Sequence, residues 1–568
     1  MTGTEANYDV IVVGSGAGGG IASYVLTQRG LRVLLLEAGR SYNPAVETPM
    51  FQVEADAPLN GAATPDKQLG FYDATVNGGF EIPGEPYTLA PGARFSWWRA
   101  RMLGGRTNHW GRVTLRYGPY DFRTYSRHGV GVDWPISYDD LAPYYDKVEK
   151  LIGVFGAAEG IENSPDSPPG ILLPPPPPRA HELWLKMVLA KKLNVQAVAK
   201  HVAVLTEPLN GRPKCIYATP CNRGCSIGAN FQSTTVLLPP ALATGKLSIR
   251  TGAMVYEIPL NKFGQAAGAR FIDTQTGVHR TVRSRAVVLA ASTCESARIL
   301  LNSTSSLFPD GLANSSGQIG YNLTDSVGIT VGGAIPALQG LDPFNDEGIS
   351  AGHIYIPWWE HRNTGSRSLP TEYHVEVGGG RCMPSVWDFS DVPDVQGKLM
   401  YGLSLRKKIR YEFGSSVGLT SFGGMIPNPD CRCEIDTRVK DHFGIPVLRF
   451  HWKWGPPEIE QAKHATNALS EMISAMGGEP SIALSSDGSA LPPGGGGTVH
   501  EVGTTRMGNH PSKSVVNPFG RTWDVRNLYV ADGASFAGQA DKNPTETIMA
   551  LAWRASEHLI ESFIRKDI

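Results

Sequence analysis

Residues 8–39 of the chain read YDVIVVGSGAGGGIASYVLTQRGLRVLLLEAG. Residues 8–13 form a short β-branched apolar run, which predicts a buried parallel strand. A helix-forming stretch follows at residues 22–28, and a second apolar run at residues 33–36 predicts another strand. The order strand, helix, strand within about 30 residues predicts the first unit of a parallel α/β sheet.

The turn between the first strand and the helix carries a Gly-x-Gly-x-x-Gly pattern. The first glycine permits a tight turn, the second lets the backbone approach a pyrophosphate, and the third lets helix and strand pack closely. The helix start offers N–H groups to the phosphates, and an acid after the second strand suits a ribose diol. That acid argues against a 2′-phosphate, so FAD or NAD is favoured over NADP. The residues expected to contact the dinucleotide are Gly14, Ser15, Gly16, Ala17, Gly19, Glu37 and Ala38.

Length and composition narrow the class of protein. The 568 residues exceed one hydrophobic core, so two closely joined domains are expected. The net charge of −1 with 18% charged residues gives no reason to expect a nucleic-acid partner. No apolar run reaches ~18 residues, so no integral membrane segment is expected. The N-terminus, MTGTEANYDV, has neither a basic nor an apolar leader region, so no export signal of its own is expected.

Two polar side chains near the C-terminal end suit alcohol oxidation. His500 lies in GGTVHEVGTTRMG and Asn543 opens NPTETIMALAWRA. Oxidising an alcohol requires removal of the hydroxyl proton while a hydride leaves the carbon, and a neutral imidazole suits the role of base. An amide can hold the alcohol oxygen without adding charge. A dinucleotide site combined with this pair predicts a flavoenzyme.

With these motifs the chain resembles the glucose–methanol–choline oxidoreductase family, and more closely its bacterial sugar-dehydrogenase and pyranose-oxidase branch. The resemblance covers nearly the whole length. At Ser292 the chain departs from the family, which usually has glycine in this turn. Besides the two ends of the chain, the resemblance includes RMLGGRTNHWGR at 101–112, DWPISYDDLAPYYDKVEKLIGVFG at 133–156, LSIRTGAMVYEI at 247–258, AVVLAASTCESARILLNS at 286–303 and GQIGYNLTD at 317–325.

The resemblance implies an α/β fold with a Rossmann-like FAD-binding domain and an antiparallel-sheet substrate-binding domain of the α+β type. The FAD-binding domain is expected to span residues 1–330, with Pro-rich and Cys-rich insertions, and to be completed by 495–568. The substrate-binding domain is expected at 331–494. Its aromatic residues offer faces for a pyranose ring, although core packing is the commoner role of such residues. They include Tyr355, Trp358, Trp359 and Trp387.

The resemblance also implies roles for single residues. His500 is the expected base and Asn543 its partner. His109 matches a histidine that some pyranose oxidases link covalently to the flavin, while packing or hydrogen bonding is the favoured alternative. Val255 matches a residue at the adenine. Further flavin or FAD contacts are expected from Gly104, Gly105, Thr107, Asn108, Asp532, Gly533 and Thr545.

Three of the seven cysteines, Cys215, Cys221 and Cys225, lie within KCIYATPCNRGCSIGA. The spacing leaves open free thiols, a disulfide plus one thiol, a zinc site or an iron–sulfur site. Zinc is disfavoured because no fourth Cys or His is close in sequence. The spacing resembles the motif of bacterial FAD sugar dehydrogenases that hold a three-iron four-sulfur cluster, and this is the favoured interpretation.

The resemblance therefore implies a dehydrogenase that oxidises a secondary alcohol of a sugar or glycoside. Within the family, the resemblance favours C3 as the oxidised carbon. Electrons would leave through the cluster to a cytochrome or quinone-type acceptor. A small companion subunit carrying the export signal would bring the protein to the periplasm; residence in the cytoplasm is the alternative. The main alternative activity is an oxygen-using pyranose or C-glycoside 3-oxidase that makes hydrogen peroxide. Gluconate or glucose dehydrogenation, a lyase and a noncatalytic FAD carrier also remain open.

Overall fold

The computed structural model of the protein describes residues 8–48, 59, 77–217, 221–342, 349, 351–358, 371–380, 397–482 and 494–568. Trp359, Trp387 and Cys382 lie outside the described residues. Within the described part of the chain, no helix combines the length and the apolarity needed to cross a membrane.

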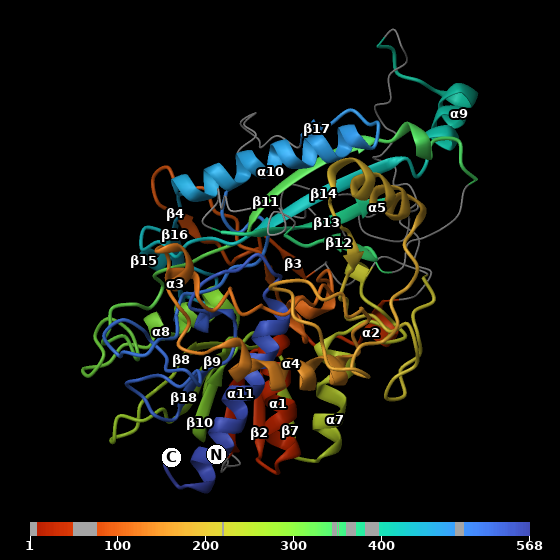
Figure 1. The fold of residues 1–568 in the computed structure, drawn as a ribbon. Helices are drawn as coiled ribbons and strands as arrows, with labels where there is room; N and C mark the ends of the chain where they lie inside the picture. The colour runs from red at the N-terminus through yellow and green to blue at the C-terminus, as the bar shows by residue number, and fades with distance from the viewer. Residues whose placement is uncertain are drawn as a thin grey trace.

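A parallel sheet forms the lower half of the molecule in Figure 1. Its order is β7-β2-β1-β10-β18, and the first half of β10 also continues into an antiparallel β8-β9-β10 extension. The prediction of an α/β fold with a Rossmann-like domain is confirmed. The strands are β1 Tyr8–Val13, β2 Val33–Leu36, β7 Leu247–Arg250, β8 Ala253–Glu257, β9 Gly268–Asp273, β10 His279–Leu289 and β18 Leu528–Val530.

Both faces of this sheet are buried, because alternate residues of each strand enter different cores. Ile11, Leu34 and Val287 belong to one core, whereas their neighbours Val10, Val33 and Val288 belong to the other. The second core includes helices α1 (Ala17–Gln28) and α11 (Thr545–Ile564), which pack on each other and lie side by side in Figure 1.

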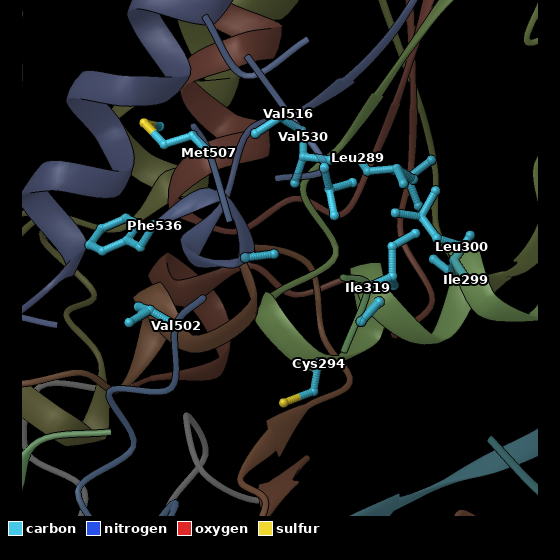
Figure 2. Packing of buried hydrophobic residues seen from close by; sticks show 14 of the residues in the cluster. Leu289, Cys294, Ile299, Leu300, Ile319, Val502, Met507, Val516, Val530 and Phe536 are labelled. Carbon is cyan, nitrogen blue, oxygen red and sulfur yellow. The ribbon is translucent and has the colours of Figure 1, made fainter. Parts of the chain in front are cut away.

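The first core lies between the strand ends and helix α8 (Thr293–Asn302). Figure 2 shows Val530 of β18 beside Leu289 of β10, and Ile299 and Leu300 of α8 on the far side of Leu289. Cys294, at the start of α8, belongs to this core and is 1% exposed.

An antiparallel sheet of order β17-β11-β14-β13-β12-β6 forms the upper half. Helix α10 (Pro456–Ala475) lies along it in Figure 1 and closes a third core. Helix α5 (Ala180–Leu193) and strand β6 join this core and sheet, although the predicted boundaries put them before residue 330. The strands are β6 Val198–Ala199, β11 Val327–Ala334, β12 Ile354–Ile356, β13 Tyr373–Gly379, β14 Ser416–Gly423 and β17 Ser481–Ile482.

A small sheet, β15-β16-β4, covers helix α8 and shares the first core, although its longer strands lie within residues 331–494. Its strands are β4 Thr88–Leu89, β15 Arg432–Lys440 and β16 Pro446–His451. The remaining elements include β3 Gly78–Gly79, β5 Arg99–Ala100, α2 Pro44–Glu47, α3 Thr124–His128, α4 Tyr138–Ile152, α6 Ser233–Val236, α7 Leu238–Ala243 and α9 Gly402–Glu412.

Candidate active site

A cavity of about 510 Å³ extends from the carboxyl ends of β1 and β2 to the start of α11. Most residues expected to bind FAD or to act on the substrate line it. These are Gly14, Ser15, Gly16, Ala17, Glu37, Ala38, Gly105, Thr107, His109, Val255, His500, Asp532, Gly533, Asn543 and Thr545. Gly19, Gly104 and Asn108 do not line the cavity.

The glycine turn leaves room for a phosphate group at the start of α1. Gly14 has a φ of 94°, and a Cβ there would meet the carbonyl oxygen of Ala290 at 2.3 Å. A Cβ at Gly19 would meet the carbonyl oxygen of Gly14 at 1.8 Å, which explains the close helix–strand packing. A Cβ at Gly16 meets nothing within 4 Å. The backbone is therefore bare where the helix N-terminus favours an anion.

Glu37 is held in place by the glycine turn itself. Its Oε2 accepts hydrogen bonds from Ser15 Oγ at 2.5 Å and Ser15 N at 3.1 Å, and its Oε1 accepts one from Gly39 N at 2.8 Å. Burial raises the pKa of this carboxyl, while the hydrogen bonds from Ser15 and Gly39 oppose that rise. The carboxyl thus stands at the cavity wall with a fixed orientation, as recognition of a diol requires.

Ser15 also ties the glycine turn to the loop at 104–109. Gly104 N donates to Ser15 Oγ at 2.8 Å, and Gly104 has a φ of 91°. Residues Gly105–Asn108 form a short 3-10 helix that brings Thr107 and His109 to the cavity. His109 Nε2 accepts a hydrogen bond from Trp98 Nε1 at 2.8 Å, which fixes the imidazole ring. The loop therefore forms one wall of the cavity.

At the other wall, Asp532 connects the end of β18 to the turn before α8. Its Oδ2 accepts from Ser292 N at 3.1 Å and from Ser296 Oγ at 2.6 Å. Ser292, at the position where the resemblance led us to expect glycine, adopts φ 88° and ψ 159°. This backbone conformation is sterically costly for any residue with a Cβ. The turn thus holds a residue with a Cβ in a strained conformation.

His500 and Asn543 meet at the far end of the cavity, although 43 residues separate them in the sequence. Asn543 Nδ2 lies 3.4 Å from His500 Nε2, and Ser326 Oγ lies 3.0 Å from His500 Nδ1. Burial lowers the pKa of His500 to about 3, against the opposing effect of Glu376. The imidazole is therefore neutral near neutral pH, as a base must be.

Sequence reasoning missed the charged residues that hold these loops together. Arg106 Nη1 pairs with Glu501 Oε2 at 2.8 Å and donates to Val499 O at 3.2 Å, which joins the 104–109 loop to the His500 loop. Arg101 contacts both Glu85 and Glu295. Arg101, Arg106, Glu295 and Glu501 all line the cavity. Their partners are far away in sequence, so no local pattern could have revealed them.

The three clustered cysteines line one small cavity of about 20 Å³. Burial raises the pKa of Cys215 to about 12. Within the described residues, their sulfur atoms are not all within 4.8 Å of one another, as ligands of a single ion are. Asn222, next to Cys221, lines the large cavity, so the cysteine segment lies directly behind its wall.

Neither of the two described candidate aromatic residues lines the large cavity. Tyr355 is buried and its hydroxyl lies 2.9 Å from Ser164 Oγ. Trp358 packs edge-on against Tyr373 with ring centres 5.2 Å apart. Both residues therefore have the packing role that the sequence left open.

Comparisons with known proteins give a consistent result. Family models described as GMC oxidoreductase match residues 190–327 and 427–552. The chain is 31% identical to 2-methyl-1,2-propanediol dehydrogenase of Mycolicibacterium austroafricanum, over 99% of this chain and 97% of the relative. It is 27% identical to the fructose dehydrogenase large subunit of Gluconobacter japonicus, over 99% of both chains. It is 26% identical to 6'''-hydroxyparomomycin C oxidase of Streptomyces lividus, over 97% and 90%.

Proposed function

Because the chain belongs to the GMC oxidoreductase family, whose members act on CH–OH groups, we propose that it is an FAD-dependent dehydrogenase of a sugar or glycoside. The oxidised group is a secondary alcohol, at C3 of the ring, and the product is a 3-keto-sugar. The observation that carries the proposal is the meeting of His500 and Asn543 in the cavity that begins at the glycine turn.

The cavity residues fit FAD, which the family implies. Gly14–Ala17 and the start of α1 would hold the pyrophosphate, Glu37 the ribose, Val255 the adenine side, and the 104–109 loop the ring system. FAD supplies the acceptor for the hydride. The hydrogen bond from Trp98 Nε1 to His109 Nε2 supports a hydrogen-bonding role for His109 and thus noncovalent binding.

The chain's own residues carry the proton step. A substrate hydroxyl placed beside both groups accepts a hydrogen bond from Asn543 Nδ2 and donates its proton to His500 Nε2. As this proton is withdrawn, the alcohol oxygen gains the electron density that drives the hydride from the carbon. Asn543 orients the oxygen and adds no charge, so the substrate's C–H bond can be held toward the hydride acceptor.

The cysteine segment supports an electron exit through a three-iron four-sulfur cluster. Arg112 links the two regions: its guanidinium donates to the carbonyl oxygens of Thr107 and Asn108 in the loop. Burial lowers its pKa to about 10, while the nearby thiols of Cys221 and Cys225 oppose that effect. The sulfur atoms of the three cysteines are not all within 4.8 Å of one another, as the ligands of one tetrahedral zinc would be. Thiolates that each bind a different iron of a cluster can lie farther apart.

The names of the relatives support two competing activities. An oxidase like the Streptomyces lividus relative would use oxygen and need no cluster. The dehydrogenase from Mycolicibacterium austroafricanum is named for a substrate, 2-methyl-1,2-propanediol, that has no secondary alcohol. The alternatives therefore differ in the acceptor and in the class of carbon oxidised.

The partners and the location belong to the same proposal. A relative named as a large subunit supports a multi-subunit enzyme. We propose a small companion subunit that carries the export signal, a cytochrome or quinone-type acceptor, and residence in the periplasm. Fractionation of the native cells, followed by purification of this chain with whatever subunit binds it, tests this: an active protein that stays in the cytoplasm without a partner contradicts it.

Anaerobic mixing of the flavin-loaded protein with single alcohols tests the activity. The panel is methyl α-D-glucoside, methyl 3-deoxy-α-D-glucoside, D-fructose and 2-methyl-1,2-propanediol, and the readout is bleaching of the oxidised flavin band. The proposal requires bleaching by the glucoside and none by its 3-deoxy analogue. Bleaching by 2-methyl-1,2-propanediol alone favours primary-alcohol oxidation, and peroxide formation in air without iron favours the oxidase.

A further inference from the structure

A buried ion pair on the antiparallel sheet lies against the catalytic end of the cavity. Glu376 of β13 is 15% exposed at its side chain and Lys200 is fully buried, with Lys200 Nζ 3.1 Å from Glu376 Oε2. Burial would raise the pKa of Glu376, but Lys200 and then His374 outweigh this effect and hold it well below its usual value. Glu376 is therefore a carboxylate, which can only accept hydrogen bonds.

This acceptor determines which way the amide of Asn543 faces. Asn543 Nδ2 donates to Glu376 Oε1 at 3.1 Å. In the reverse orientation, Asn543 Oδ1 would face the carboxylate, and two acceptors would repel each other. The same Nδ2 lies 3.4 Å from His500 Nε2. A donor at that place favours an unprotonated Nε2.

A second chain of hydrogen bonds reaches the other imidazole nitrogen. The hydroxyl of Tyr117 donates to Gln539 Oε1 at 3.1 Å, so Gln539 Nε2 faces Ser326 Oγ, 3.0 Å away. Ser326 Oγ lies 3.0 Å from His500 Nδ1 and can accept a hydrogen bond from an Nδ1–H group. The contact with Asn543 favours a neutral imidazole with the proton on Nδ1, and the Ser326 hydroxyl, which can donate or accept, is compatible with it.

We propose that Glu376, held ionised by Lys200, is a positioning residue that keeps the lone pair of His500 Nε2 directed at the substrate hydroxyl by fixing the amide of Asn543. Glu376 acts through Asn543 and does not itself exchange a proton with the substrate. The inference rests on the proposed role of His500 as the base.

The substitution Glu376→Gln tests the inference without a change of shape. Lys200 can only donate, so it would bind the carbonyl oxygen of the new side chain and leave its NH₂ group facing Asn543. Asn543 would then turn its Oδ1 toward both this NH₂ group and His500 Nε2, which favours a proton on Nε2. Glu372→Gln is the matched control, because Glu372 precedes β13 and lines the neighbouring small cavities instead.

The first measurement needs no substrate. Nitrogen NMR of protein labelled with ¹⁵N-histidine distinguishes the two neutral tautomers, and the His500→Ala protein identifies the signals of His500. We expect the Nδ1–H tautomer in the wild type and in Glu372→Gln, and the Nε2–H tautomer in Glu376→Gln. A proton on Nε2 in the wild type, or an unchanged tautomer in Glu376→Gln, overturns the inference even if no alcohol in the panel reduces the flavin.

The second measurement uses the panel alcohol that reduces the flavin fastest, in single turnovers. Glu376→Gln should slow reduction by about 10²-fold, as loss of a correctly oriented base does, with the substrate's Kd changed less than about threefold. In an Asn543→Ala background, the same substitution should slow flavin reduction by less than about threefold, because the amide through which Glu376 acts is absent. Equal losses in both backgrounds would mean that Glu376 supports the fold only, and would overturn the inference.

Discussion

At the scale of single residues, the environment of His500 makes it both a base and a neutral group. Its Nε2 faces the cavity beside Asn543, and Ser326 contacts its Nδ1. His500→Ala should leave folding and FAD content intact but slow flavin reduction by a panel alcohol by about 10²-fold or more. Stopped-flow absorbance measures this rate. His510→Ala is the control: because His510 is exposed, the flavin of this variant should be reduced at the wild-type rate. A near-normal rate of flavin reduction in the His500→Ala protein would eliminate His500 as the base.

The lowered pKa of His500 also predicts a pH dependence. Burial reduces this pKa to about 3, so the base form is populated at every pH above that value. As pH falls from about 8 to about 5, the rate of flavin reduction at saturating substrate should therefore show no loss that is due to His500. A rate that falls tenfold per pH unit below pH 6.5, and that loses this fall in the His500→Ala protein, would show that the imidazole titrates near its usual value.

At the scale of elements, two glycines of the glycine turn have different expected roles: Gly19 allows helix–strand packing, and Gly16 allows cofactor binding. A Cβ at Gly19 meets a backbone oxygen at 1.8 Å, whereas a Cβ at Gly16 meets nothing within 4 Å. Gly19→Ala should destabilise the fold by about 3 kcal/mol or more, because neither backbone can move away. Gly16→Ala should keep the melting temperature of the flavin-free protein and lose FAD. Thermal melts with flavin quantification check both; a Gly16→Ala protein with full FAD content would place the pyrophosphate elsewhere.

The turn at Ser292 predicts a gain of stability. Its φ of 88° with ψ 159° costs a non-glycine residue about 1–3 kcal/mol. Ser292→Gly should recover about 1 kcal/mol of this after the greater chain entropy of glycine, and raise Tm by about 1–2 °C. Ser470→Gly, within helix α10, makes the same substitution at a helical position and should lower Tm. A drop in Tm for Ser292→Gly would mean that the serine is not strained.

The sequence predicts those elements whose signals are local. Strands β1 and β2 have their predicted bounds, because β-branched runs and glycines determine them directly. Helix α1, however, begins at Ala17 and not at Ala22, because packing against neighbouring backbone outweighs the low helix propensity of its glycines. The pairs Arg106–Glu501 and Lys200–Glu376 join distant segments, so only the folded chain reveals them.

At the scale of the whole molecule, the cysteine segment lies behind the wall of the cavity and provides the proposed exit for electrons. Cys221→Ser should leave substrate reduction of the flavin unchanged in a single turnover but slow steady-state transfer to a cytochrome, because one cluster ligand is lost. Iron content should fall with it. Cys431→Ala is the control, because this buried thiol belongs to the first core. Iron-free wild-type protein, prepared without oxygen, would contradict the cluster.

The way the parallel sheet is assembled has a consequence for the biosynthesis of the protein. Strand β1 pairs on one side with β10, where Val10 lies opposite Ala286, and helix α1 packs against α11, which begins at Thr545. A nascent chain on the ribosome therefore exposes an unpartnered β1 edge until about half of the message has been translated, and it lacks Asn543 until near the end. Such long-range pairing makes folding slow and prone to aggregation. Flavin capture should thus follow chain release, and chains released prematurely before residue 543 should emerge colourless rather than with a partly working site.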